Sequence, residues 1–300
     1  MADQEASLKT YRGNCQCAAY VYEITLPEIK DASECNCSIC YKKAALWVFP
    51  KPKDVKFVKG DPSTLSNYTF GKKMFSHKFC PTCGHSIMVV GHLEPPKPGE
   101  DKEPENGINI RLLQHGQVDP WAIPVKTFDG KNIIKPGYEE PQFTGPEPTA
   151  EVENGQLYTG SCHCGAVKVA MKMKTLDKDS ASTLTMCNCS SCGKAGAIWG
   201  YPNKPQVTLQ GEENLSRYLF GNKTAGKMFC KICGVLVYNH MMTFTEEEKA
   251  AMTEENRAWV EGGKDLMPIN LRVIHGLDMK DWKIPQFDGY TKLPPPYVEP

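Results

Sequence analysis

The sequence of 300 residues has no long apolar run, and no stretch approaches the roughly 18 apolar residues that span a bilayer. Its first residues, MADQEASLKTYRG, lack the apolar core of a secretory signal peptide. These two absences argue against a membrane protein and against a secreted one. We therefore expect a cytoplasmic protein that makes no membrane contact.

The sequence also has no excess of charge of either sign. Lysine and arginine total 35 residues, aspartate and glutamate total 35, and no run of basic residues occurs. Because nucleic-acid-binding proteins usually present a basic face to phosphates, we expect no nucleic-acid partner. Apolar residues make up 40% of the chain, which is enough for packed cores.

Two halves of the chain are similar to each other along most of their length. The matched segments are 13–24 with 160–171, CNCSIC at 35–40 with CNCSSC at 187–192, 65–84 with 215–234, and 107–130 with 268–289. Such self-similarity indicates a tandem duplication. Lys135–Gly155, rich in proline, glycine and glutamate, is the predicted linker. We expect one domain at 1–145 and a second at 146–300.

The apolar pattern outside the linker is mainly that of β-strands. Short strands are predicted at Ala166–Lys174, Tyr20–Leu26, Ile87–His92, Ile108–Leu113, Gln206–Gln210, Leu215–Phe220, Val235–His240 and Ile269–Ile274. Short strands between proline and glycine turns predict two small all-β domains of packed sheets.

One segment differs between the halves. Thr245–Gly263 predicts a helical insertion in the second half, in which Ala251, Met252 and Trp259 form an apolar stripe that docks on the domain. The corresponding Leu93–Gly107 predicts an irregular surface loop.

Cysteine is abundant, and all fourteen cysteines lie inside the repeat, seven in each half. In a reducing compartment this number indicates metal ligation or catalysis rather than disulfides. On an extended strand, C-x-C presents two thiolates on one face, and C-x-x-C does the same around a turn. Two such pairs complete a four-sulfur zinc site. The pairs are Cys15/Cys17 with Cys80/Cys83, and Cys162/Cys164 with Cys230/Cys233.

A triplet of cysteines remains in each half. The triplets are Cys35, Cys37 and Cys40, and Cys187, Cys189 and Cys192. Three protein ligands and an open fourth position are typical of a catalytic zinc, so we expect about two zinc ions per half. Two alternatives stay open: free thiols with a redox role, or a histidine that closes the tetrahedron.

The candidate histidines for that closure do not occur at matching positions. They are His77, His85 and His163, whereas His115 and His275 both precede a glycine and recur in the alignment. The recurring pair could act in acid–base chemistry, although a turn histidine is more often structural.

At these motifs the chain resembles the glutathione-dependent formaldehyde-activating enzyme family, also called the centromere protein V domain family. The family pattern G-x-C-x-C-G, C-x-C-S-x-C, F-C-x-x-C-G is present as GSCHCG, CNCSSC and FCKICG in the second half, and as GNCQCA, CNCSIC and FCPTCG in the first. The resemblance implies an all-β zinc fold, structural zinc at the four-cysteine sets and active-site zinc at the triplets. Members often have a histidine where this chain has Asn36 and Asn188.

The resemblance implies an activity as well. Members add glutathione to formaldehyde, so a carbon–sulfur lyase with glutathione as substrate or cosubstrate is expected. The substrate is then a small thiol adduct or another small electrophile. The alternative is a non-catalytic zinc module for protein or chromatin binding. A homodimer is compatible with either function.

Several other residues recur beside the cysteine motifs. Asn109/Arg111 and Asn270/Arg272 could bind an anion, but an ion pair within the repeat is the simpler interpretation. Lys43, Lys194, His77 and Lys227 could attract an anionic tripeptide, although each is more readily explained as a solvated charge. The aromatic pairs Trp47/Trp199, Trp121/Trp282 and Phe128/Phe287 are predicted to lie in the core or to pack between the repeats.

Overall fold

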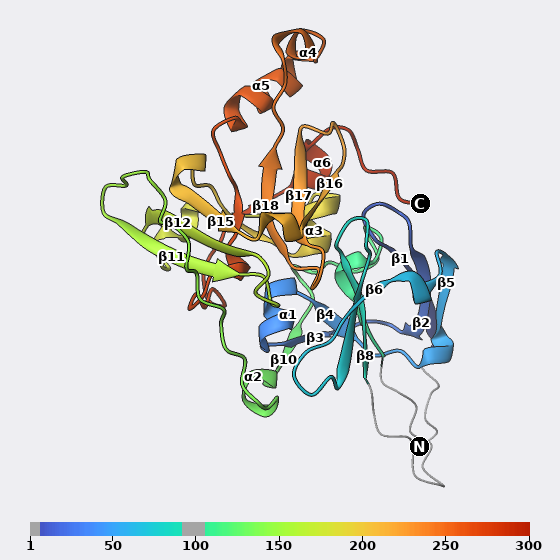
Figure 1. Ribbon diagram of the computed structural model, residues 1–300. Helices are drawn as coiled ribbons and strands as arrows, with labels where there is room; N and C mark the ends of the chain where they lie inside the picture. The colour runs from blue at the N-terminus through green and yellow to red at the C-terminus, as the bar shows by residue number, and fades with distance from the viewer. Residues whose placement is uncertain (1–6, 92–105) are drawn as a thin grey trace. The chain divides into compact units, whose positions relative to one another are not determined.

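The computed structural model describes residues 7–91 and 106–300, and their regular secondary structure is mainly β-strand (Figure 1). The chain divides into two compact units, Met1–Tyr138 with Glu299–Pro300, and Glu139–Val298. No helix or strand occurs in the described segment from residue 134 to residue 154, which fits the predicted linker. The division of the chain at residues 145 and 146 stays a prediction.

The first unit contains two sheets. A three-stranded sheet has the order β1-β2-β5, with β1 (Leu8–Asn14), β2 (Val21–Pro27) and β5 (Val55–Lys59). A seven-stranded sheet has the order β10-β3-β4-β9-β8-β7-β6. Its strands are β3 (Ala32–Cys35), β4 (Leu46–Val48), β6 (Ser66–Tyr68), β7 (Phe75–Phe79), β8 (Ser86–Gly91), β9 (Asn106–Asn109) and β10 (Val125–Phe128). Two short helices, α1 (Ser38–Lys43) and α2 (Gly130–Ile133), follow β3 and β10.

The second unit repeats this plan. Its three-stranded sheet has the order β11-β12-β15, with β11 (Gly155–Ser161), β12 (Lys168–Lys174) and β15 (Val207–Gln210). The seven-stranded order is β16-β17-β18-β19-β14-β13-β20, formed by β13 (Thr185–Cys187), β14 (Ile198–Gly200), β16 (Leu215–Leu219), β17 (Ala225–Cys230), β18 (Leu236–Met241), β19 (Ile269–Asn270) and β20 (Gln286–Phe287). The short helices are α3 (Ser190–Ala195) and α6 (Gly289–Lys292). The predicted all-β class with two similar halves is confirmed.

The core of each unit lies where the strands place apolar side chains on one face. On β2, Tyr22 and Ile24 are fully buried, whereas Glu23 between them is half-buried and pairs with Arg12 on β1 at 2.7 Å. This is the period-two alternation that defines a strand with one face against a core. Phe79 on β7 and Phe229 on β17 occupy equivalent fully buried positions in the two units.

Two predicted strands are shorter than expected. Ile108–Leu113 and Ile269–Ile274 were expected as strands throughout, but β9 ends at Asn109 and β19 at Asn270. Each asparagine side chain accepts a hydrogen bond from the backbone N–H two residues later, which turns the chain into a 3₁₀ helix. Of the predicted strand Ile87–His92, His92 lies outside the described residues, as do residues 93–105 of the predicted loop.

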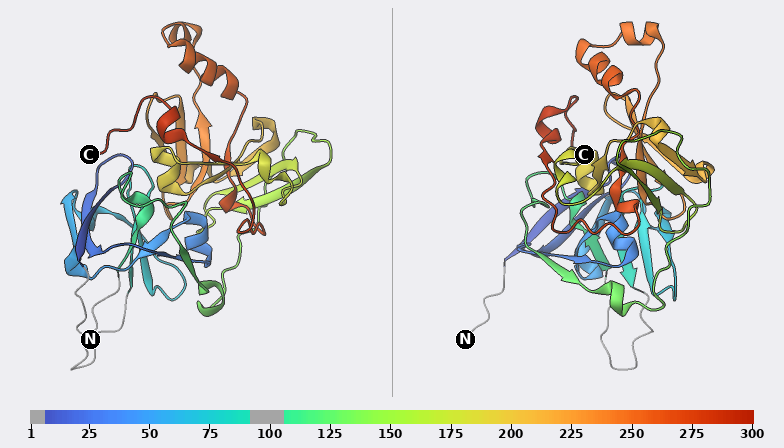
Figure 2. Two further views of the ribbon diagram at one scale, coloured as in Figure 1. Left: turned by 180° about the vertical axis from the view of Figure 1, so that it is seen from behind. Right: turned by 90° about the vertical axis from the view of Figure 1, so that its left-hand side faces the viewer.

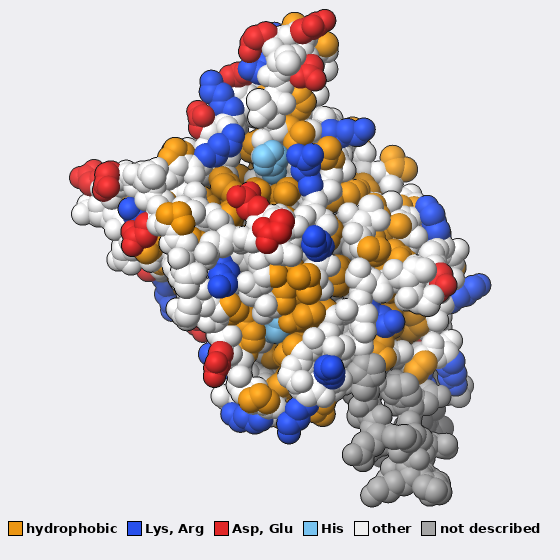
Figure 3. Space-filling model, viewed as in Figure 1, with side chains coloured by type: hydrophobic (Ala, Val, Ile, Leu, Met, Phe, Trp, Pro, Cys, Tyr) orange, Lys and Arg blue, Asp and Glu red, His pale blue; other side chains and the backbone are white. Residues whose placement is uncertain are grey.

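The helical insertion is present but broken into two helices, α4 (Glu246–Ala250) and α5 (Glu254–Gly263). Figure 2 shows both extending away from the sheets of the second unit, and Figure 3 shows acidic side chains gathered at this tip. The expected apolar stripe is wrong, because Trp259 is 52% exposed and Ala251 is exposed as well. Val260 and Gly263 are the buried positions of α5 instead.

Candidate metal centres

Four cysteines converge in each unit at one end of the small sheet. Cys15 and Cys17 follow β1, and Cys80 and Cys83 lie in the turn after β7. The four Sγ atoms lie within 4.8 Å of one another, with 3.6 Å between Cys15 and Cys17 and 3.5 Å between Cys17 and Cys80. A zinc ion with Zn–S bonds of about 2.3 Å has sulfur atoms separated by about 3.8 Å. The donor set therefore fits a tetrahedral zinc.

The second unit has the same arrangement. Its four cysteines, Cys162, Cys164, Cys230 and Cys233, again have all Sγ atoms within 4.8 Å. The Sγ of Cys164 lies 3.5 Å from that of Cys162 and 3.6 Å from that of Cys230. Both units thus bring together the cysteines that the sequence paired.

The backbone turn after each C-x-C motif explains which residues lie beside it. The N–H of Tyr20 donates to Cys15 Sγ at 3.4 Å, and the N–H of Val167 donates to Cys162 Sγ at 3.3 Å. The turn that allows this needs a left-handed residue, which is Gly165 at φ 77° in the second unit and Ala18 at φ 56° in the first. Glycine adopts this conformation without the steric conflict of a Cβ, so the second unit has the less strained turn.

The triplet cysteines also converge, one cluster in each unit. Cys35 ends β3, Cys37 caps the N-terminus of α1 and Cys40 lies in its first turn. In the second unit Cys187, Cys189 and Cys192 hold the same places on β13 and α3. In both clusters the Sγ atoms lie within 4.8 Å of one another.

Ionisation of these clusters depends on a cation. Hydrogen bonds from Cys37 and Cys40 lower the pKa of Cys35 to about 3, whereas hydrogen bonding to Cys35 and Cys37 and then burial raise the pKa of Cys40 well above its usual value. One thiolate is therefore stabilised by two thiols. Three thiolates this close together need a positive ion to offset their repulsion, and a zinc ion supplies that charge.

A repeated Phe-Asp-Gly turn closes over each triplet. β10 pairs with β3 in parallel, with Phe128 opposite Cys35, and the following Gly130 begins α2. A Cβ on Gly130 would overlap the Sγ of Cys35, and a Cβ on Gly289 would overlap the Sγ of Cys187. Only glycine fits at these two positions. This part of the site was not predicted from the sequence, although FDG recurs at residues 128–130 and 287–289.

The asparagine inside each triplet locks this turn. Asn188 donates from Nδ2 to Asp288 Oδ1 at 2.9 Å and accepts the N–H of Tyr290 at Oδ1, also at 2.9 Å. Asn36 makes the same two bonds in the first unit, to Asp129 and from the N–H of residue 131, both at 2.8 Å. These asparagines join the cysteine loop to the FDG turn.

Arg111 and Arg272, which recur in the two halves, contact the C-terminal ends of α1 and α3, the helices that carry triplet cysteines. Arg111 donates from Nε to the carbonyl oxygen of Ala44 at 2.6 Å, and Arg272 donates to that of Gly196 at 2.8 Å. Asn109 accepts the N–H of Leu46 at 3.2 Å. These contacts are with the backbone that leaves α1 and α3, so they fix the helix ends.

The sequence alignment of His115 with His275 is wrong. The bridges Gly13–Leu113 and Gly160–Ile274 place Gln114, not His115, at the site equivalent to His275. His275 Nε2 lies 3.0 Å from the hydroxyl of Ser161, and Gln114 lies at the same edge of the first unit. Among residues 7–91 and 106–300, the four clusters consist of cysteines alone, without His77, His85 or His163.

The basic residues expected on the surface are buried. Lys227 on β17 is 2% exposed, donates to Cys192 Sγ at 3.0 Å and lies 4.3 Å from the ring centroid of Trp199. His77 occupies the matching position on β7 and stacks on Phe70 with centroids 5.8 Å apart. Lys43 and Lys194 are also buried. The prediction of solvated charges is therefore wrong for all four residues.

The aromatic residues divide into two groups. Trp47 and Trp199 are buried as predicted, but Phe128 and Phe287 are 53% and 38% exposed, because β10 and β20 are edge strands.

Another difference between the halves is at Tyr201, where the first half has Phe49. Tyr201 is 39% exposed, yet its partial burial raises the pKa of its phenol, and the thiolates of the second triplet add to that rise. This phenol keeps its proton at neutral pH.

One described cavity lies away from the cysteines. It has a volume of about 390 Å³ and is lined by Lys9, Thr10, Tyr11, Glu28, Ile29 and Gln117. None of the fourteen cysteines contributes to its wall.

Comparisons with known proteins identify the repeated domain. The family model for glutathione-dependent formaldehyde-activating enzyme matches residues 10–99 and 157–257. The crystal structure of a Rhodobacter sphaeroides protein, a structural-genomics target, is 25% identical and covers 43% of this chain and 99% of its own, with a TM-score of 0.32. Within the described residues, no helix has the length and apolarity to cross a membrane. The chain belongs to the glutathione-dependent formaldehyde-activating enzyme family and carries two copies of its domain.

Proposed function

We propose that this protein is a cytoplasmic zinc enzyme of the carbon–sulfur lyase type, acting on the adduct of a small thiol with an aldehyde or on another small electrophile. The thiol is glutathione or a relative of it, as the family name suggests. The observation that carries the proposal is the second triplet, where three converging thiols have a buried ammonium group beside them.

The cysteines present suit two kinds of zinc site. The four-cysteine sets would hold structural zinc and the triplets a zinc with an open fourth position, as the distances between the sulfur atoms allow. A zinc ion bound by three thiolates supplies a Lewis acid that takes a sulfur or oxygen atom as its fourth ligand.

Lys227 adjusts the charge of the second site. Three thiolates and a divalent cation leave a net charge of minus one, which the ammonium 3.0 Å from Cys192 offsets. An anionic substrate sulfur is then tolerated better in the second unit than in the first, where His77 occupies this position. We therefore assign the main activity to the second triplet.

Tyr201 is our candidate proton donor. When a thiol adds to an aldehyde, the carbon–sulfur bond forms and the proton of the thiol is transferred to the carbonyl oxygen. A phenol that keeps its proton can donate to that oxygen and recover the proton from the thiol, and the reverse sequence breaks the bond. The first unit lacks this group because Phe49 stands there.

The proposal is tested with Cys189→Ser and Cys37→Ser, each assayed for formation of S-hydroxymethylglutathione and of other thiol–aldehyde adducts. We expect Cys189→Ser to reduce turnover at least 100-fold and Cys37→Ser to reduce it less than threefold, while circular dichroism shows both folded. Tyr201→Phe, which copies the first half, should reduce turnover at least tenfold. Unchanged turnover in a folded Cys37→Ser, Cys189→Ser double variant would refute catalysis and favour a non-catalytic zinc module.

A further inference from the structure

A short motif follows each repeat. Tyr138–Pro141 reads YEEP and Tyr297–Pro300 reads YVEP, and each begins eight residues after the glycine of the FDG turn. The motif is thus Tyr-x-Glu-Pro at the same distance from the triplet site in both halves. It lies outside the matched family segments 10–99 and 157–257.

The end of each motif folds with the opposite repeat. Glu299 and Pro300 follow the second repeat, yet they belong to the first compact unit. Residues from Glu139 onward follow the first repeat, yet they belong to the second unit. The chain therefore exchanges its two Glu-Pro segments reciprocally.

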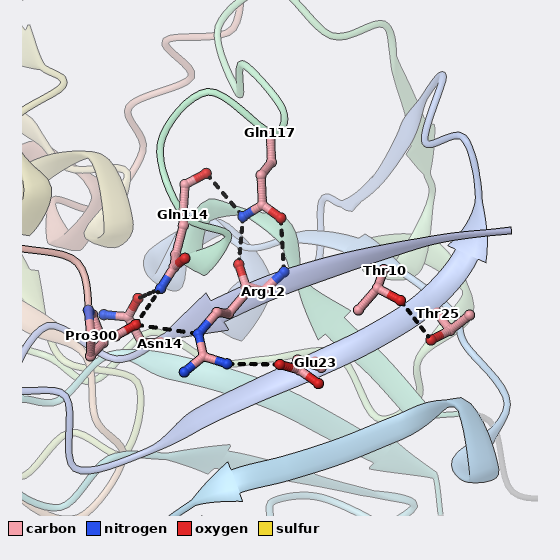
Figure 4. Close-up of polar contacts among 8 residues, drawn as sticks. All are labelled: Thr10, Arg12, Asn14, Glu23, Thr25, Gln114, Gln117 and Pro300. Carbon is pink, nitrogen blue, oxygen red and sulfur yellow. Dashed lines mark hydrogen bonds and ion pairs between the residues drawn. The ribbon is translucent and has the colours of Figure 1, made fainter.

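The first unit binds its segment through polar groups at the edge of the small sheet. Arg12 donates from Nε to the Pro300 oxygen at 3.2 Å, and Gln114 donates from Nε2 to the same oxygen at 3.0 Å (Figure 4). The N–H of His115 donates to Glu299 Oε1 at 3.4 Å. Both the glutamate and the proline of the motif are therefore contacted.

Arg12 is also held by contacts that do not involve the segment. Its guanidinium pairs with Glu23 at 2.7 Å (Figure 4). The side-chain amide of Gln117 forms two hydrogen bonds with the backbone of Arg12. It accepts the Arg12 N–H at 2.8 Å and donates to the Arg12 carbonyl oxygen at 2.6 Å. A preorganised donor loses little entropy on binding.

The second unit holds the other copy at the equivalent edge with different residues. His275, which stands at the position of Gln114, has Nδ1 3.7 Å from Glu140 Oε2. Pro141 lies so close to Gly165 that a Cβ there would come within 2.8 Å of the proline ring. The glutamate and the proline are again the contacted residues.

The segment is also connected to the second triplet. Leu293 packs against the cluster of Cys187 and Cys192, and the ring of Tyr297 lies 5.7 Å from Nζ of Lys194 on α3. A bound segment therefore restrains the chain that leaves the candidate zinc site.

We propose that Tyr-x-Glu-Pro is a docking motif of this chain and that each unit carries a receptor for it at the edge of its small sheet. In the first unit the receptor is Arg12, Gln114 and the N–H of His115, and its occupant is the segment ending at Pro300. The internal copy at Pro141, which contacts the equivalent edge of the second unit, supports this proposal. The inference is independent of the proposed enzyme activity.

The test uses the chain shortened to end at Tyr297 and the peptide acetyl-Pro-Tyr-Val-Glu-Pro-amide, followed by the backbone amide NMR signals of Arg12 and His115. We expect saturable shifts in the shortened chain, and at least tenfold weaker binding to the full chain, because the tethered segment competes at an effective concentration in the millimolar range. Arg12→Ala in the shortened chain should weaken binding about tenfold, whereas Arg217→Ala, an exposed arginine of the second unit, should not.

Two outcomes would overturn the proposal: a folded shortened chain that shows no saturable shift, or equal peptide binding by the shortened and full chains. If the shortened chain does not fold, the full chain decides the question. Amide hydrogen exchange at His115 should then be at least tenfold faster in Arg12→Ala than in Arg217→Ala. Equal rates would exclude the receptor.

Discussion

Lys227 is the residue that most distinguishes the two triplet sites. It is buried between Cys192 and the rings of Trp199 and Phe220, with its ammonium 4.3 Å and 5.5 Å from the two ring centroids. A buried lysine is tolerated only when a counter-charge or aromatic faces compensate for lost hydration. The second triplet provides both, which implies that thiolates and ammonium stabilise each other.

We predict that Lys227→Met destabilises the second unit by about 3 kcal/mol, because removal of one partner leaves buried charge uncompensated. It should also accelerate release of one zinc ion to a chelator at least tenfold. Chemical denaturation and a colorimetric chelator assay measure the two effects. Lys178→Met, on an exposed turn of the second unit, is the matched control. Equal zinc release by both variants would contradict the prediction.

The cysteines could be predicted at the residue scale, but the lysine could not. The groups of four and of three that their spacing predicts are the groups whose Sγ atoms converge, because C-x-C and C-x-x-C have few geometric solutions. Lys227 lies on the same face of β17 as the buried Phe229, two residues away, and this spacing was the sequence feature that indicated burial of the lysine. The general preference of lysine for solvent favoured the opposite prediction.

The FDG turn is the element that completes each triplet site. It follows an edge strand, β10 or β20, and is fastened to the cysteine loop by the asparagine side chain. A cysteine Sγ occupies the space that a Cβ would need at the glycine of each turn. The turn and the cluster must therefore form together.

We predict that Asn188→Ala releases this turn in the second unit. Two hydrogen bonds are lost, so we expect a stability loss of about 1–3 kcal/mol and at least tenfold faster amide exchange at Tyr290. Hydrogen exchange followed by mass spectrometry measures the second effect. Asn67→Ala, at an exposed position of β6 in the first unit, serves as control. Unaltered exchange at Tyr290 would show that the asparagine does not hold the turn.

Elements could be predicted where periodicity extends over several residues. The strand predicted at Ala166–Lys174 corresponds to β12, whereas the strand predicted at Ile108–Leu113 ends at Asn109. A single side-chain hydrogen bond to the backbone decides that ending, and apolar periodicity does not report it. The parallel strand β10 was not predicted either, since its four residues are all exposed.

At the scale of the whole molecule, each unit has a four-sulfur cluster that joins its small sheet to the β7–β8 or β17–β18 turn. Zinc bound there would connect segments more than sixty residues apart in sequence. Such sites contribute directly to folding, whereas the triplets involve one short loop.

We predict four zinc ions per chain and unequal effects of their loss. Cys162→Ser should abolish cooperative unfolding of the second unit, because a structural ligand is lost, whereas Cys189→Ser should remove one zinc and leave that unit folded. Elemental analysis and calorimetry together provide the measurement. About two zinc ions per wild-type chain would contradict the open-site assignment.

The duplication and the all-β class could be predicted for the whole molecule, since seven matched cysteines in each half indicate the repeat. The membership of Glu299 and Pro300 in the first unit could not. It depends on Arg12 and Gln114, which are far from these residues in sequence, and the second half has His275 at the position of Gln114.

The parallel pairing of β10 with β3 limits the insertions and deletions that the chain can accept near the FDG turn. Phe128 faces Cys35 in register, and the glycine that must lie against the sulfur comes two residues later. One residue inserted between Val125 and Gly130 would shift the strand by about 3.3 Å and reverse its faces. Chain length is therefore constrained here, in contrast to the segment between β18 and β19, which contains α4 and α5 and is longer than the segment between β8 and β9.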